Sequence, residues 1–164
     1  MRMRQRVEPG PGQDSVWDYP RPPRVEAVPE RVRIEFGGHV VVDTVDAVRV
    51  LETSHPPVYY VPRDAVTAEL LPAPGASLCE FKGAAKYLSM RVGDRVADSA
   101  IWYYPTPSPG YEALAGRIAV YPGRVDRCEV AGETVVPQQG DFYGGWITSK
   151  VVGPFKGAPG TWGW

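Results

Sequence analysis

Cysteine is scarce in this sequence. Only Cys79 and Cys128 occur in 164 residues, and neither belongs to a CxxC pair. Two isolated cysteines cannot supply a four-sulfur zinc site. In a cytosolic chain they are expected to be thiols rather than a disulfide. We therefore expect no metal site and no bound cofactor.

Long apolar runs are also missing. No stretch approaches the roughly 20 apolar residues that a membrane helix needs. The start of the chain, MRMRQRVEPGPGQD, lacks the apolar segment of a signal peptide. We therefore expect a cytoplasmic protein with no membrane partner.

The sequence also has no excess of charge of either sign. The chain has 18 Lys and Arg against 19 Asp and Glu, for a net charge of −1. Nucleic-acid binding needs a strongly positive field, so we expect no nucleic-acid partner. Arg2, Arg4 and Arg6 are a local exception, which indicates a frayed terminus more than a binding arm. We assign residues 1–14 to that frayed segment and 15–164 to a single β domain.

Glycine and proline are abundant instead, with 18 of each. Proline removes a backbone donor and clashes with the preceding helical turn, so long helices are excluded. Disorder is excluded as well, because five tryptophans and nine tyrosines must be buried somewhere.

Alternating apolar residues predict strands joined by tight turns. In residues 31–36, Val32, Ile34 and Phe36 alternate with charged residues, and Gly37-Gly38 follows as a hairpin turn. The same pattern recurs around Gly93-Asp94 and around Ala131-Gly132. Three such units predict a mainly antiparallel β protein.

Helical and terminal segments complete the prediction. Residues 62–71, with Asp64 as a cap, and residues 109–116 each predict one or two helical turns. Trp17 and Tyr19 predict an N-terminal arm that lies against the body. Three tryptophans in the glycine-rich C-terminal tail predict a wrapped, packed segment: Trp146, Trp162 and Trp164.

Five blocks of the sequence resemble a bacterial family, the domain of unknown function 427. They are VWDYPRPPRVE, LETSHPPVYYVP, CEFKGAAKY, WYYPTP and FYGGWITSKVVGPFKGAPGTWGW. The resemblance implies a small β-tent, in which two antiparallel sheets meet over one core, with an extended N-terminal arm and a wrapped C-terminal tail. It implies no reaction. The word nucleotidyltransferase is attached to the family, but neither a P-loop nor a Gly-Ser turn followed by an Asp-x-Asp strand occurs here.

Glu52 and Lys82 are the charged candidates. Alternation in residues 48–52 places Glu52 on the same face as Val48 and Val50, which we expect to be the inner one. An inward carboxylate is costly unless it is paired, and Lys82 is the candidate partner. The pair either fixes the fold or anchors a ligand in a pocket.

Cys79, Ser54 and His55 are the candidates for nucleophilic chemistry. Cys79 lies three residues before Lys82, whose ammonium would favour the reactive thiolate. A buried, inert thiol is the alternative. Ser54 and His55 do not indicate a triad, because neighbours on an extended chain point to opposite faces. We interpret His55 as a local polar residue.

Aromatic residues form the largest candidate set. Trp102 and Tyr104 are expected on one strand face with Ile101 and Tyr103 on the other, and Tyr59 and Tyr60 are expected to divide in the same way. Such a face is either an aromatic core or the wall of a small-molecule pocket. The candidate ligand-binding residues are Glu52, Tyr60, Lys82, Tyr87, Trp102, Tyr104 and Tyr121.

Three functions therefore stay open. The first is a binding module for an unidentified small molecule. The second is an enzyme with Cys79 as nucleophile and Lys82 or Glu52 handling protons. The third is a protein-interaction domain that uses the Trp-rich tail, with a homodimer as one form of it.

Overall fold

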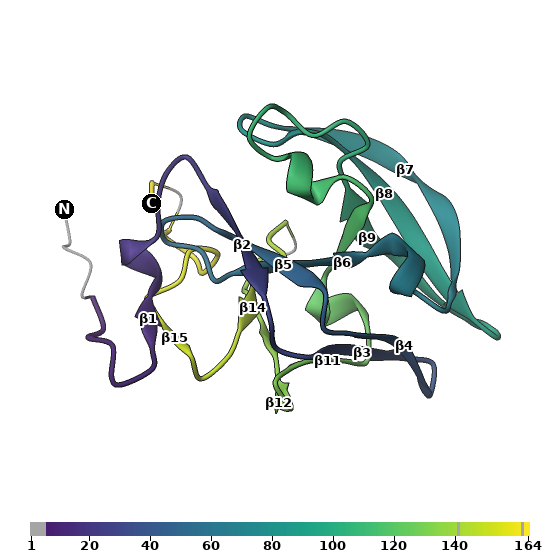
Figure 1. The fold of residues 1–164 in the computed structure, drawn as a ribbon, viewed down its shortest axis with the longest axis horizontal. Coiled ribbons are helices and arrows are strands. Elements are labelled where there is room, and N and C mark those ends of the chain that lie inside the picture. The colour runs from purple at the N-terminus through teal and green to yellow at the C-terminus, as the bar shows by residue number, and fades with distance from the viewer. Residues whose placement is uncertain (1–5, 141, 162) are drawn as a thin grey trace.

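The computed structural model describes residues 6–140, 142–161 and 163–164 (Figure 1). It is mainly β, as predicted. The strands are β1 (Asp14–Ser15), β2 (Arg24–Val28), β3 (Val32–Phe36), β4 (His39–Thr44), β5 (Ala47–Leu51), β6 (Val58–Pro62), β7 (Glu69–Cys79), β8 (Gly83–Val92), β9 (Arg95–Tyr103), β10 (Arg117–Val120), β11 (Arg127–Val130), β12 (Glu133–Thr134), β13 (Val136–Pro137), β14 (Trp146–Ile147) and β15 (Val151–Val152).

Two antiparallel sheets make up most of the fold. The larger has seven strands in the order β2-β5-β6-β10-β9-β8-β7, and the smaller has four in the order β12-β11-β3-β4. Two small sheets join the chain ends to this frame, an antiparallel β13-β14 pair and a parallel β1-β15 pair. Figure 1 shows β7, β8 and β9 on the side of the molecule opposite both termini. None of the sheets closes into a barrel.

The three predicted hairpins are confirmed. Phe36 pairs with His39 across Gly37-Gly38, Val92 pairs with Arg95, and Val130 pairs with Glu133. Each turn contains residues with positive φ, and even Ala131 adopts a φ of 51° in its turn. Turn chemistry was therefore a sound guide to topology here.

The helical prediction is only partly right. The described helices are four three-residue 3-10 turns: η1 (Val16–Asp18), η2 (Arg63–Ala65), η3 (Glu112–Leu114) and η4 (Pro122–Arg124). The turn in 109–116 is confirmed as η3, but in 62–71 only η2 forms. Leu70 and Leu71 instead pair with Met90 and Ser89 in the β7-β8 ladder. Strand pairing overrides the helical spacing of those leucines. None of the described helices has the length and apolar character needed to cross a bilayer.

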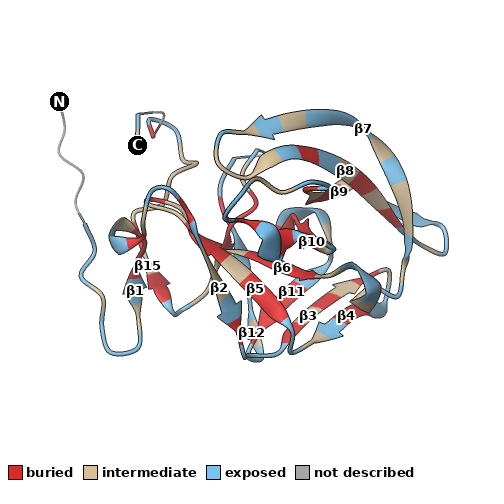
Figure 2. Ribbon diagram, turned by 45° about the horizontal axis from the view of Figure 1, so that its top comes forward, coloured by how far each residue is buried: buried red, intermediate tan, exposed pale blue. Residues whose placement is uncertain are grey.

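The main core, here called the first core cluster, lies between the two large sheets. Ile34, Phe36 and Cys128 enter it from the smaller sheet, and Val61 and Ile101 enter it from the larger. Figure 2 shows the buried positions concentrated along the central strands, whereas β7 is half-buried or exposed throughout. Because successive side chains of a strand point to opposite faces, the remaining side chains of the larger sheet lie on its other face, away from this core.

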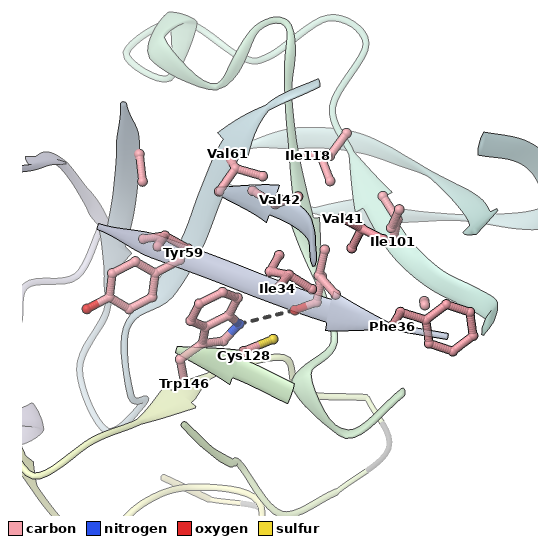
Figure 3. Packing of buried hydrophobic residues seen from close by; sticks show 14 of the residues in the cluster. Ile34, Phe36, Val41, Val42, Tyr59, Val61, Ile101, Ile118, Cys128 and Trp146 are labelled. Atoms are coloured by element: carbon pink, nitrogen blue, oxygen red, sulfur yellow. Dashed lines mark hydrogen bonds between the residues drawn. The ribbon is translucent and has the colours of Figure 1, made fainter. Parts of the chain in front are cut away.

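The packed C-terminal tail is confirmed at Trp146. Its indole is buried in the first core cluster, with its ring centroid 4.9 Å from that of Tyr59, and its Nε1 donates to the Val120 carbonyl at 3.1 Å (Figure 3). Trp164 lies near Trp17, with ring centroids 5.3 Å apart. Trp162, the third predicted anchor, lies outside the described residues.

The N-terminal arm also packs as expected from Ser15 onward. Val16 and Tyr19 are buried in a small cluster with Leu51 and Val151. The Trp17 indole donates to the Pro154 carbonyl at 2.9 Å. Within the segment assigned as frayed, residues 1–5 lie outside the described residues, and the boundary at residue 14 falls inside β1.

Candidate functional site

The outer face of the seven-stranded sheet carries a second core cluster. Adjacent residues divide between the two faces, so Tyr59 and Ile101 enter the first core cluster while Tyr60 and Trp102 enter the second. Tyr104 follows Trp102, and Tyr103 packs on the opposite face, as the sequence predicted. Strand alternation therefore collects the aromatic side chains on one face.

A cavity of about 350 Å³ opens beside the second core cluster, and we call it the aromatic pocket. The structure brings every sequence-predicted site residue to it: Glu52, Tyr60, Cys79, Lys82, Tyr87, Trp102, Tyr104 and Tyr121. These residues come from strands β6 to β9, from the end of β5 and from the segments that follow β7, β9 and β10. The predicted alternatives, an aromatic core and a pocket wall, describe two sides of one cluster.

Buried rings form the inner wall of the aromatic pocket. The Trp102 and Tyr121 ring centroids are 4.5 Å apart, and Trp102 Nε1 donates to the Tyr60 hydroxyl at 3.3 Å. Burial raises the pKa of Tyr60 well above its usual range, and burial beside Tyr60 does the same for Tyr104. The phenols are therefore neutral hydrogen-bonding groups in an apolar wall.

Glu52 lies on the expected face, but its partner is not Lys82. Its Oε2 accepts from Arg21 Nη2 at 3.4 Å, and the Glu52 side chain is 24% exposed. Arg21 comes from the proline-rich arm, 31 residues away in the sequence. An arm residue therefore balances the pocket carboxylate, which local spacing could not indicate.

Cys79 ends β7, and Lys82 lies in the turn between β7 and β8. The Lys82 backbone N–H donates to Cys79 Sγ at 3.4 Å, and Cys79 pairs with Gly83 across the turn. Among the described residues, no ion pair or hydrogen bond engages the Lys82 ammonium. Cys128, in contrast, is buried in the first core cluster, and burial raises the pKa of its thiol well above the ordinary value.

One side of the pocket consists of residues that were not among the predicted site residues. Its residues are His55, Gln138, Phe142, Tyr143, Gly144 and Lys156. His55 was interpreted as a local polar residue, yet its ring packs 5.5 Å from that of Tyr143, and its Nε2 is 3.8 Å from Glu52 Oε2. The rejection of a Ser54-His55 triad agrees with the geometry, because Ser54 Oγ is buried with no hydrogen-bond partner in the described structure.

Burial and neighbouring cations keep His55 neutral. Burial is the main cause, and Lys156, Arg21 and Lys82 add to it, so that the pKa of His55 falls to about 4. The imidazole therefore faces Glu52 as a neutral ring at pH 7, and the contact is polar rather than an ion pair.

Gln138 fixes the orientation of this side of the pocket. Its Oε1 accepts from the Gly145 N–H at 3.1 Å, and its Nε2 donates to the Lys156 carbonyl at 2.6 Å. Nε2 also lies 3.4 Å from His55 Nδ1. Since the amide presents a donor to Nδ1, the neutral imidazole carries its proton on Nε2, toward Glu52.

Two consecutive glycines let the tail approach this closely. A Cβ on Gly144 would overlap the Trp102 ring, and a Cβ on Gly145 would overlap the Gln138 amide and Pro56. The FYGGW block therefore brings backbone directly against the pocket wall. A glycine pair between aromatic residues was the available signal for this contact.

A second hollow, of about 370 Å³, lies near β2 and the Ala131 turn. Its buried cation, Arg49, is already bonded to Glu26, with Nε to Oε1 at 2.8 Å. Its lining carries one aromatic ring, that of Tyr59. The aromatic pocket is therefore the better candidate for a ligand site.

Residues 24–131 match the family model described as a domain of unknown function, DUF427. The chain belongs to this family. The matched span runs from β2 to the Ala131 turn and contains all the site residues predicted from the sequence, whereas Gln138, Tyr143 and Lys156 lie beyond it. No curated protein matches the chain.

Proposed function

We propose that this DUF427 domain is a small-molecule binding module, and that the ligand occupies the aromatic pocket. The observation that carries the proposal is the convergence of seven aromatic rings with a few polar groups around one cavity. Ligand sites are typically concave, mostly apolar and equipped with a few oriented polar groups. Here the oriented groups are Glu52, held by Arg21, and His55, held by Gln138.

Native mass spectrometry of the freshly purified protein is the direct test. An excess mass that is lost on denaturation identifies a ligand, and the same spectrum reports whether the homodimer forms. Tyr87→Ala should remove that mass because Tyr87 lines the pocket and is only half-buried. Tyr103→Ala is the matched control, since Tyr103 is equally half-buried but packs on the opposite face. An adduct that both variants retain would place the ligand elsewhere.

A second candidate function is a small enzyme with Cys79 as nucleophile. It is favoured by the position of Cys79 in the pocket, with the Lys82 N–H directed at its sulfur. Iodoacetamide at neutral pH should then label Cys79 far faster than buried Cys128, as peptide mapping would show. Equal, slow labelling of both cysteines would rule this function out.

The third function, interaction through the Trp-rich tail, has less support. Trp146 is fully buried, and Pro154 and Phe155 pack against the N-terminal arm. These contacts use the tail inside the molecule. Trimming residues 154–164 should therefore destabilise the fold rather than release a partner, and a folded, monomeric truncated chain would reverse this view.

A further inference from the structure

The charges around the aromatic pocket do not cancel, and this imbalance indicates the kind of ligand. Among the residues that the structure describes, the pocket lining contains one carboxylate, Glu52, and two ammonium groups, those of Lys82 and Lys156. Glu52 is already paired with Arg21, which stands outside the lining. The negative charge is thus balanced by the arm, and the lysines keep a positive field in the cavity.

Lys82 is the lysine available to a ligand. Lys156 Nζ donates to the Trp164 main-chain oxygen at 3.1 Å, so its position is fixed by the tail. The Lys82 ammonium, in the part of the chain that the structure describes, is engaged in no such contact. Lys156, Arg21 and Lys82 also act on His55, where they add to the larger effect of burial in lowering its pKa.

The walls define the rest of the ligand. Rings of Tyr87, Trp102 and Tyr121 line the cavity, and two exposed apolar side chains, Leu78 and Phe142, flank it. A flat apolar body would stack on such rings and exclude water from them. A polar or highly hydrated ligand would make poor contacts with these apolar surfaces.

We propose that the aromatic pocket binds a planar aromatic carboxylic acid as its anion, with the carboxylate on the Lys82 ammonium and the ring system against the aromatic wall. This inference rests on the proposed binding function. A carboxylate is favoured over a phosphate ester because the described lining residues include no arginine fork and no helix N-terminus, the groups that usually hold phosphate.

Three isosteric probes test the charge of the ligand: naphthalene-2-carboxylate, naphthalene-2-carboxamide and protonated naphthalen-2-ylmethylamine. All three should enter a cavity of about 350 Å³. Titration calorimetry with the full chain should give a Kd for the carboxylate at least about tenfold below that of the carboxamide, as expected for a charge-assisted hydrogen bond. The amine should bind most weakly. Equal binding of acid and amide, or tighter binding of the amine, overturns the inference.

Variants assign the charge to a residue. Lys82→Met keeps an apolar stem and should raise the Kd of the carboxylate about tenfold, to the level of the carboxamide, while leaving the carboxamide unchanged. Lys86→Met is the control, because Lys86 is exposed on β8, close to Lys82 in the sequence, and lies outside the pocket lining. An unchanged carboxylate affinity in Lys82→Met overturns the role of Lys82.

The failure of this inference is distinguishable from failure of the proposed function. If none of the three probes binds at millimolar concentration, the proposed ligand class is wrong. The binding function itself falls only if native mass spectrometry also finds no releasable adduct on the purified protein. A neutral or cationic adduct lost in Tyr87→Ala would keep the binding function and reject the aromatic acid.

Discussion

The two faces of the seven-stranded sheet differ in what covers them. One face is sealed by the four-stranded sheet, and the side chains between them are mostly aliphatic, with Trp146 as the large insert. The other face is covered, in the part of the chain that the structure describes, by loops, by η3 with its buried Leu114 and by the C-terminal tail, and it is rich in tyrosine. The same alternating pattern of side chains therefore builds a closed core on one face of the sheet and an open pocket on the other.

The cysteines show the same division. Cys128 belongs to the sealed face and is fully buried, whereas Cys79 is half-buried at the pocket. Polar groups divide likewise, because the pocket face gathers tyrosine hydroxyls, Glu52, His55 and Gln138 within one lining. Polar groups beside aromatic rings are compatible with the binding function proposed for this face.

The largest expected effect is on the sealed face. Trp146→Ala should destabilise the fold by about 3–5 kcal/mol, because it removes a fully buried ring and leaves the Val120 carbonyl without its donor. Tyr87→Ala, on the pocket face, should cost clearly less, since Tyr87 is half-buried. Urea unfolding measures both free energies. Equal losses would mean that the pocket face is as much a core as the sealed one.

The next effect depends on pH. Folding lowers the pKa of His55 from 6.5 to about 4, so between these values the unfolded chain binds a proton that the folded chain does not. The stability associated with this group is therefore complete above pH 6.5 and is lost as the pH falls toward 4. At about 1.4 kcal/mol per pKa unit, a shift from 6.5 to about 4 sets an upper bound of about 3.5 kcal/mol on the loss.

Histidine variants isolate this contribution. His55→Gln should flatten the dependence of the unfolding free energy on pH between 6.5 and 4. His39→Gln changes the other histidine, which is exposed at the start of β4, and should leave the dependence intact. A wild-type pH dependence in His55→Gln would show that His55 titrates normally in the folded protein.

Local sequence signals predicted the sheets well and the pocket in part. Gly37-Gly38, Gly93-Asp94 and Ala131-Gly132 identified the hairpins because turn conformation is decided within a few residues. Strand alternation likewise placed Trp102 and Tyr104 together. Both signals depend on residues that are close together in the sequence, so they can be recognised without the structure.

Contacts between distant segments were not predictable in the same way. Arg21 reaches Glu52 from the arm, and Gln138 reaches His55 across 83 positions. Only the folded chain brings these groups together, because Lys82 and Arg21 are almost equally distant from Glu52 in the sequence and spacing does not choose between them. The strand at Leu70 and Leu71 was missed for the same reason, since its partner is β8 rather than its own neighbours.

A smaller effect tests how the tail closes the pocket. Gly144→Ala forces a methyl group into the Trp102 ring and should cost about 1–3 kcal/mol. It should also weaken binding of any pocket ligand, because the tail must shift away from the wall. Gly123→Ala is the control, since its Cβ would make only ordinary contacts with Pro137. The unfolding free energy tests the expected loss of stability, and the probe affinity tests the expected loss of binding. A Gly144→Ala variant that changes neither would show that the tail does not pack on Trp102.

The smallest effect on stability, and the sharpest on the pocket, is expected at Arg21. The Arg21–Glu52 pair is partly exposed, with 44% of the Arg21 side chain accessible, so Arg21→Met should change stability by less than about 1 kcal/mol. It should nevertheless weaken binding of naphthalene-2-carboxylate, because Glu52 would then act on the cavity as an unbalanced negative charge. Arg91→Met breaks the exposed Arg91–Glu69 pair and has a similarly small expected cost, but Arg91 lies outside the pocket lining. If both variants leave the probe affinity unchanged, the arm does not set the charge of the pocket. The two faces of the sheet would then differ in the segments that cover them and not in electrostatics.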